Sequence, residues 1–116
     1  MHELSITERI LSIVLQHANA NAVHRVVRIH LRVGGLSDLE DEWIQRYFDH
    51  LSRGTLAEQA QLMITRAPIV LKCLSCAAVV SVSRDELTRA ACPSCGNGDL
   101  TLQSGREYVI ENMEVL

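Results

Sequence analysis

The sequence predicts an α+β fold, in which two helices pack on a short mixed sheet of about three strands. Two segments repeat apolar residues with the 3.6-residue period of a helix that buries one face, and three shorter segments have the pattern of strands. The strand pattern stops near residue 68, gives way to a segment that holds all four cysteines, and returns after residue 105. We therefore expect a four-cysteine module inserted between two strands of one sheet.

The first helix is expected at residues 3–18 and the first strand at residues 24–33. The apolar stripe of the helix comprises Ile6, Ile10, Ile13 and His17, flanked by Leu11, Val14 and Ala18. In the strand, Val27, Ile29, Leu31 and Val33 alternate with His24, Arg28, His30 and Arg32, and only Val26 interrupts the pattern. This period of two predicts a half-buried strand, which should end at Gly34 and Gly35.

The second helix is expected to start with a capping box formed by Ser37 and Glu40, and to end at Arg53-Gly54. Its predicted apolar stripe comprises Trp43, Ile44, Tyr47, Phe48 and Leu51. A second capping-box spacing, Thr55 with Glu58, predicts a short helical turn. Strands are then expected at residues 62–66 and 107–115.

Length and charge narrow the class of protein. The chain has 116 residues, enough for one ordinary domain with a small satellite, and a formal net charge of −3. An acidic chain with a single lysine, Lys72, is unlike a nucleic-acid-binding protein, which usually has a basic patch. No apolar run reaches the roughly 18 to 20 residues of a membrane span, and the N-terminus lacks a signal-peptide pattern. We therefore expect a cytoplasmic protein with reduced thiols.

The four cysteines form two C-x2-C motifs, Cys73 with Cys76 and Cys92 with Cys95, separated by fifteen residues. Two tight turns of this kind can direct four thiolates at one ion in a tetrahedron, which predicts one structural zinc in a zinc-ribbon-like module. An iron site of the rubredoxin type and a thioredoxin-type redox pair are weaker alternatives. The first would need aromatic packing that this segment lacks, and the second needs only one C-x-x-C motif.

The chain opens with Met1-His2-Glu3. The α-amine of Met1, the deprotonated amide of His2 and its imidazole can form adjoining chelate rings around one ion, and such nitrogen donors suit Ni(II) or Cu(II). Glu3 could complete the ligand set. The residues alone leave open the simpler alternative that His2 is a solvated terminal residue.

These two features, together with further motifs, make the chain resemble the HypA/HybF family of nickel-insertion proteins for [NiFe]-hydrogenase maturation. The resemblance covers essentially the whole chain. Its motifs are Met1-His2-Glu3-Leu4-Ser5, Val33-Gly34-Gly35-Leu36-Ser37, Arg53-Gly54-Thr55-Leu56-Ala57-Glu58, the two cysteine pairs, and Ile110-Glu111-Asn112-Met113-Glu114-Val115.

The resemblance implies a metallochaperone without enzymatic activity. It would bind labile nickel at Met1 and His2, with Glu3 and Glu40 as candidate additional donors, and one structural zinc on Cys73, Cys76, Cys92 and Cys95. The implied partners are a HypB-type GTPase and the hydrogenase large-subunit precursor, and some relatives also serve urease maturation. In this interpretation residues 1–68 and 105–116 form the nickel-binding domain and residues 69–104 form the zinc module.

Two alternatives remain from the residues themselves. Glu40 can act simply as the acid of a capping box. The chain as a whole can be a zinc-ribbon protein-interaction module without a nickel function, which would explain the cysteines and leave the N-terminus unused. The other histidines, His17, His24, His30 and His50, are expected to be polar residues of helix ends and of an exposed strand face.

Overall fold

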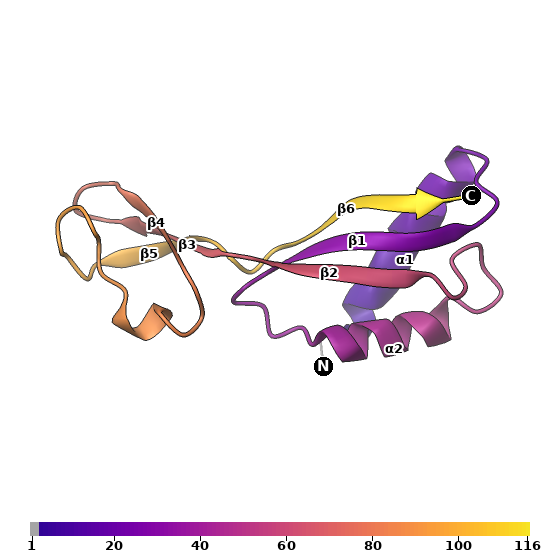
Figure 1. Cartoon of the computed structure of the whole chain (residues 1–116), viewed down its shortest axis with the longest axis horizontal. Helices are drawn as coiled ribbons and strands as arrows, with labels where there is room; N and C mark the ends of the chain where they lie inside the picture. The colour runs from indigo at the N-terminus through magenta and orange to yellow at the C-terminus, as the bar shows by residue number, and fades with distance from the viewer. Residues whose placement is uncertain (1–2) are drawn as a thin grey trace. The chain divides into compact units, whose positions relative to one another are not determined.

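A computed structural model describes residues 3–116 of the chain (Figure 1), so Met1 and His2, two residues of the predicted nickel site, lie outside the described part. Two α-helices, six strands and one short 3-10 helix follow each other along the chain. They are α1 (Glu3–Ala20), β1 (Val26–Gly34), α2 (Asp41–Leu51), β2 (Gln61–Ala67), β3 (Ile69–Cys73), β4 (Val79–Val82), η1 (Leu87–Arg89), β5 (Leu100–Ser104) and β6 (Tyr108–Val115).

The described residues divide into two compact units. Unit one contains the residues up to Arg32, Asp38–Thr65 and Val109–Leu116, and unit two contains Val33–Ser37 and Arg66–Tyr108. Each unit has a three-stranded sheet of its own, in the order β2-β1-β6 and β4-β3-β5. The two helices belong to unit one and the four cysteines belong to unit two.

The sheet β2-β1-β6 is mixed, as the sequence predicts. Strand β6 runs antiparallel to β1, because Leu116 exchanges backbone hydrogen bonds with Arg25 at the start of β1, while Glu107 accepts one from Gly34 at its end. Strand β2 runs parallel to β1, because the amide of Val26 donates to Leu56 O and the hydroxyl of Thr65 donates to Leu31 O. Helix α2 forms the crossover that such a parallel pair requires.

The core of unit one lies between the helices and one face of this sheet. Its largest fully buried side chains are Ile10, Val14, Ile29, Leu31, Ile44 and Phe48. Val26, which interrupts the alternation of the sequence, is also buried, whereas Val27 is only half-buried. The strand β1 ends at Gly34, as predicted.

Helix α1 confirms the predicted helix and extends two residues beyond it, to Ala20. The face that it buries is rotated from the predicted stripe, because Ile6 and Ile13 are half-buried and His17 is exposed. The buried residues are Glu3, Thr7, Ile10, Leu11, Val14 and Ala18. The hydroxyl of Thr7 donates a hydrogen bond to the carbonyl of Glu3, which explains how this polar side chain is buried within the helix.

Two predictions about helix α2 are wrong. The helix begins at Asp41 with Glu40 as N-cap, and no side-chain hydrogen bond caps it, so the Ser37–Glu40 capping box is not formed. Of the predicted apolar stripe, Ile44 and Phe48 are buried, but Trp43 is exposed. Apolar character therefore identified the period of this helix but not the width of the face that it buries.

Residues 55–60 form a bend and turns where the sequence predicts a short helical turn. The hydroxyl of Thr55 accepts a hydrogen bond from Ala57 N and donates one to Ser52 O, while the amide of Glu58 donates to the Thr55 carbonyl. These local bonds satisfy the backbone in one turn without continuing into a helix, because β2 already begins at Gln61.

Unit two contains a second, antiparallel sheet that the sequence analysis did not predict. Strand β3 pairs with β4 on one side, with Leu71 opposite Val80, and with β5 on the other, with Leu71 opposite Leu102. Its buried core is small, with Ile69, Leu71 and Val82 at the centre. A bound metal can stabilise a small module of this kind.

Candidate metal centre

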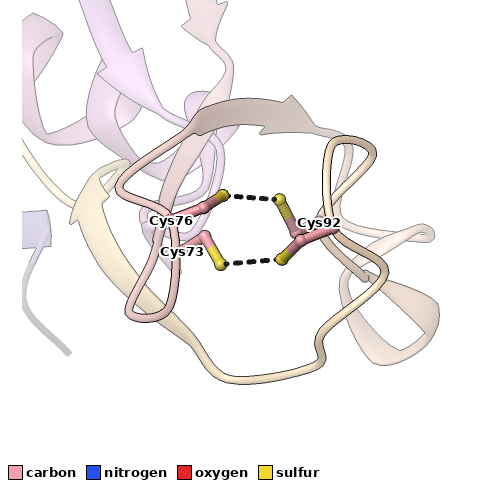
Figure 2. A group of neighbouring side chains, drawn as sticks. Cys73, Cys76 and Cys92 are labelled. Atoms are coloured by element: carbon pink, nitrogen blue, oxygen red, sulfur yellow. Dashed lines mark hydrogen bonds between the residues drawn. The ribbon is translucent and has the colours of Figure 1, made fainter.

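The structure brings the four cysteines of unit two together (Figure 2). Their four sulfur atoms all lie within 4.8 Å of one another, and among residues 3–116 no other cluster of three or more potential histidine, cysteine or carboxylate ligands is found. The closest pairs join the two motifs, with 3.6 Å between the sulfurs of Cys73 and Cys95 and 3.4 Å between those of Cys76 and Cys92. All four are free cysteines.

These sulfur distances fit a tetrahedral zinc ion. A Zn–S bond of about 2.3 Å places two thiolates of a tetrahedron about 3.8 Å apart, close to the separations in this cluster. The donor set of four thiolates is that of a closed structural site, which leaves no position for a water molecule or a substrate. The residues present therefore fit the predicted zinc ion.

Both cysteine motifs use the same backbone arrangement. The amide of Cys73 donates to Ala78 O and its carbonyl accepts from Ala77 N, while the amide of Cys92 donates to Asn97 O and its carbonyl accepts from Gly96 N. Ala77 and Gly96 occupy equivalent positions and both have a positive φ, 64° and 74°. Gly96 adopts this conformation readily because it has no Cβ, whereas the first motif places an alanine in it.

A side-chain hydrogen bond ties the two motifs together. The amide nitrogen of Asn97 donates to the hydroxyl of Ser75 over 2.6 Å, and the backbone amide of Leu74 donates to Asp99 O. Cys73 and Cys92 are buried, whereas Cys76 and Cys95 are exposed. In each motif the first cysteine is therefore buried and the second lies at the surface.

The local environment favours the thiolate form of two of the four cysteines, Cys73 and Cys92. The backbone amide of Cys95 lowers the pKa of Cys92 to about 6, despite the opposing effect of burial. The backbone amide of Cys76 similarly lowers the pKa of Cys73. The amide of Ala78 lowers the pKa of Cys76, but the neighbouring Cys92 sulfur and burial outweigh it and raise the value to about 12. Thiolate is the form that binds metal, so two of the four ligands are favoured as thiolates.

Of the candidate nickel ligands, the structure describes Glu3 and Glu40, and both belong to unit one. Glu3 is the first residue of α1 and its side chain is buried, with 9% of its surface exposed. Glu40 is the exposed N-cap residue of α2. Met1 and His2 lie outside the described residues, so the nickel site itself stays a prediction.

Two of the other histidines have the surroundings that the sequence predicts, whereas His24 lies before β1 and not on the strand. His17 and His50 lie in the last turns of α1 and α2, where a basic side chain complements the helix dipole. His30 contacts Glu114 of β6, with 2.8 Å between its Nε2 and the carboxylate. The sequence analysis did not find this pairing, because the two residues are 84 positions apart and only the register of the sheet joins them.

The chain matches a known protein family, "Hydrogenase/urease nickel incorporation, metallochaperone, hypA", over residues 1–115. The chain belongs to the HypA family. It is 37% identical to the hydrogenase maturation factor HypA of Acidithiobacillus ferrooxidans over 115 residues, which cover 99% of both chains. It is also 36% identical to HypA of Rhodobacter capsulatus over 116 residues, the full length of both.

Solved structures agree on the fold. The solution structure of the Ni metallochaperone HypA from Helicobacter pylori superposes with a TM-score of 0.70 at 22% identity, covering 100% of this chain and 98% of that one. A second solution structure of a HypA protein gives a TM-score of 0.75, also at 22% identity. The α+β fold and the membership of a nickel metallochaperone family, both predicted from the sequence, are confirmed. Among the described residues, no helix is long and apolar enough to cross a bilayer.

Proposed function

We propose that this protein carries Ni(II) at its N-terminus and passes it, together with a HypB-type GTPase, to the large-subunit precursor of a [NiFe]-hydrogenase in the cytoplasm. The observation that carries the proposal is the opening Met1-His2-Glu3 in a chain that matches the HypA family along its length. Urease maturation proteins are further candidate partners, since the family name includes urease.

The three nitrogen donors of the proposed nickel site can reach one ion through local chain geometry alone. The Met1 amine, the His2 amide nitrogen and the His2 imidazole are consecutive donors that close adjoining chelate rings. The amine nitrogen, the deprotonated amide nitrogen and the imidazole suit Ni(II). The imidazole must be neutral to bind. Glu3 follows directly, and Glu40 is the candidate donor from another element.

The four cysteines have a different role in this proposal. When bound, zinc would crosslink the two cysteine motifs, and Cys73, Cys76, Cys92 and Cys95 would hold it. These residues keep the small unit two folded and take no part in transferring nickel. The protein would thus combine a site that retains its ion with a chain end that releases its ion, and it would have no catalytic activity of its own.

Nickel titration of the untagged protein tests the proposal. Replacing His2 with alanine removes the imidazole, and an N-terminal extension by two residues converts the amine into an amide, so each should weaken nickel binding by at least about tenfold, roughly the loss of one strong ligand. His24→Ala, which removes another exposed histidine of unit one, is the matched control and should bind nickel like the wild type. Isothermal titration calorimetry provides the dissociation constants.

Unchanged nickel affinity in both N-terminal variants would contradict the proposed site. Zinc binding by the cysteines would be unaffected by that result. The protein would then fit the alternative of a zinc-ribbon protein-interaction module better than that of a nickel carrier.

A further inference from the structure

Helix α2 presents an aromatic side chain to solvent where the sequence predicts a buried one. Trp43 keeps 42% of its surface exposed, and it is the only tryptophan of the chain. The ring of Tyr47, one turn further along the helix, lies with its centroid 5.8 Å from that of Trp43. Tryptophan is enriched at protein interfaces, because its ring combines a large apolar surface with a polar N–H.

The indole is held in place by neighbouring charges. The guanidinium of Arg46 lies 5.2 Å from the centre of the Trp43 ring, in the range of a cation–π contact. Glu42 in turn holds Arg46 through an ion pair of 2.6 Å. We call Glu42, Trp43, Arg46 and Tyr47 the α2 patch. Because its members contact each other, a partner that binds the patch meets side chains that are already ordered.

The surroundings of the α2 patch are strongly acidic. Residues 38–50 hold five carboxylates, those of Asp38, Glu40, Asp41, Glu42 and Asp49, and a single guanidinium, so their formal charge is −4. The whole chain has a formal charge of −3, which leaves +1 for all other residues. Most of the formal negative charge of the chain therefore lies in residues 38–50, the segment that carries the α2 patch.

We propose that the α2 patch is a docking surface for a partner protein whose matching surface is an apolar pocket rimmed by lysine or arginine side chains. Tryptophan, tyrosine and arginine are the residues that most often dominate the affinity of protein interfaces. Charge complementarity selects a basic partner and accelerates its association. A second copy of this chain fits less well, because a two-fold interface would place the two acidic surfaces against each other.

The experiment uses the full-length, zinc-loaded chain and two purified probes, the HypB-type GTPase and the hydrogenase large-subunit precursor of the same organism. The inference rests on the proposed function only for this choice of probes. Trp43→Ala should weaken binding of at least one probe by about tenfold or more, as for an interface hot spot. Glu42→Lys should also weaken it, and should reduce the dependence of the affinity on salt.

Matched controls separate docking from folding. Met63→Ala removes another exposed apolar side chain of unit one, and Glu8→Lys makes the same change of charge on α1, so both should bind like the wild type. Trp43→Phe should retain part of the affinity. Fluorine NMR of protein labelled with 5-fluorotryptophan reports the single indole directly, and its resonance should shift when the probe is added.

Three outcomes would overturn the inference. The first is that neither probe binds the wild type, and the second is that a probe binds the Trp43 and Glu42 variants as tightly as it binds the controls. The third is self-association of the chain that Trp43→Ala abolishes, which would make a second copy the occupant. Nickel titration of Trp43→Ala distinguishes the proposed docking surface from the proposed nickel site. This variant should bind nickel like the wild type although its binding to the probe is weakened.

Discussion

Glu114 on β6 contacts two polar side chains of the neighbouring strand β1. It accepts hydrogen bonds from His30 Nε2 at 2.8 Å and from Arg28 at 3.1 Å. The hydrogen bond from His30, followed by the charge of Arg28, lowers the pKa of the Glu114 carboxyl below its usual 4.5. His30 and Arg28 both belong to β1, so this carboxylate links the neighbouring strand to β6.

The lowered pKa gives the stability of unit one a defined pH dependence. A carboxyl whose pKa is lower in the folded state stabilises it fully above the unfolded pKa, and this stabilisation disappears as the pH falls through the folded value. Glu114→Gln should therefore lower the urea midpoint slightly at about pH 6 and by less at about pH 3. Trp43 fluorescence monitors the unfolding of unit one.

Glu111→Gln is the control on the same strand, because Glu111 is exposed and has no ion pair in the described structure. A Glu114 variant that loses the same stability at both pH values would show that its contribution is not electrostatic. The alternation of β1 predicted that Arg28 and His30 share a face. Their contact with Glu114 could not be predicted, because only the pairing register of β1 and β6 places Glu114 beside Arg28 and His30.

At the scale of elements, Gly34 at the end of β1 makes the closest backbone approach among the glycines. A Cβ atom at this position would lie 2.1 Å from Gly105 O and 2.7 Å from Arg106 N. Gly105 itself has a φ of 144°, and its carbonyl accepts a hydrogen bond from Leu36 N. The Val33-Gly34-Gly35 motif thus allows two backbone segments of unit two to lie in direct contact.

Gly34→Ala should lower the free energy of unfolding by about 2 kcal/mol or more, because the obstacle is backbone that cannot rotate away. Gly98→Ala is the matched control, since a Cβ there meets nothing within 4 Å, and its effect should stay within about 0.5 kcal/mol. Chemical denaturation followed by circular dichroism measures both. Equal stability of the two variants would contradict the assigned role of Gly34.

The start of α2 shows where element-level prediction fails. The spacing of Ser37 and Glu40 fits a capping box, yet the helix begins only at Asp41. Residues Val33–Ser37 belong to unit two, and Leu36 packs against the apolar cluster around Ile69 and donates a hydrogen bond to Gly105 O. Packing thus holds the chain before α2 in an extended path, and this overrides a local capping preference.

For the whole molecule, the division into two units predicts independent responses to metal removal. Unit two has a small apolar core, and zinc binding can contribute on the order of 10 kcal/mol to a module of this kind. A strong chelator should therefore unfold unit two while unit one, whose core includes Ile29 and Phe48, stays folded. Hydrogen exchange followed by mass spectrometry should show loss of protection in β3 and β5 but not in α1 or α2.

Restoring protection with one equivalent of zinc would complete this test. Simultaneous unfolding of both units would show that they form one cooperative structure. Full protection of unit two after the metal is removed would instead show that its apolar core suffices. Cys92→Ser, which removes one of the buried ligands, should reproduce the effect of the chelator without any added reagent.

Local patterns were sufficient to predict several features of this protein. The helix predicted at residues 3–18, the three strands of the mixed sheet and the pairing of two cysteine motifs all follow from short-range spacing, because backbone geometry repeats every few residues. Tertiary contacts decided the rest: the exposure of Trp43, the late start of α2, the partner of His30 and the small second sheet. Each of these depends on residues distant in the sequence, and which side chains share a surface is set by packing and strand register rather than by the identity of neighbours along the chain.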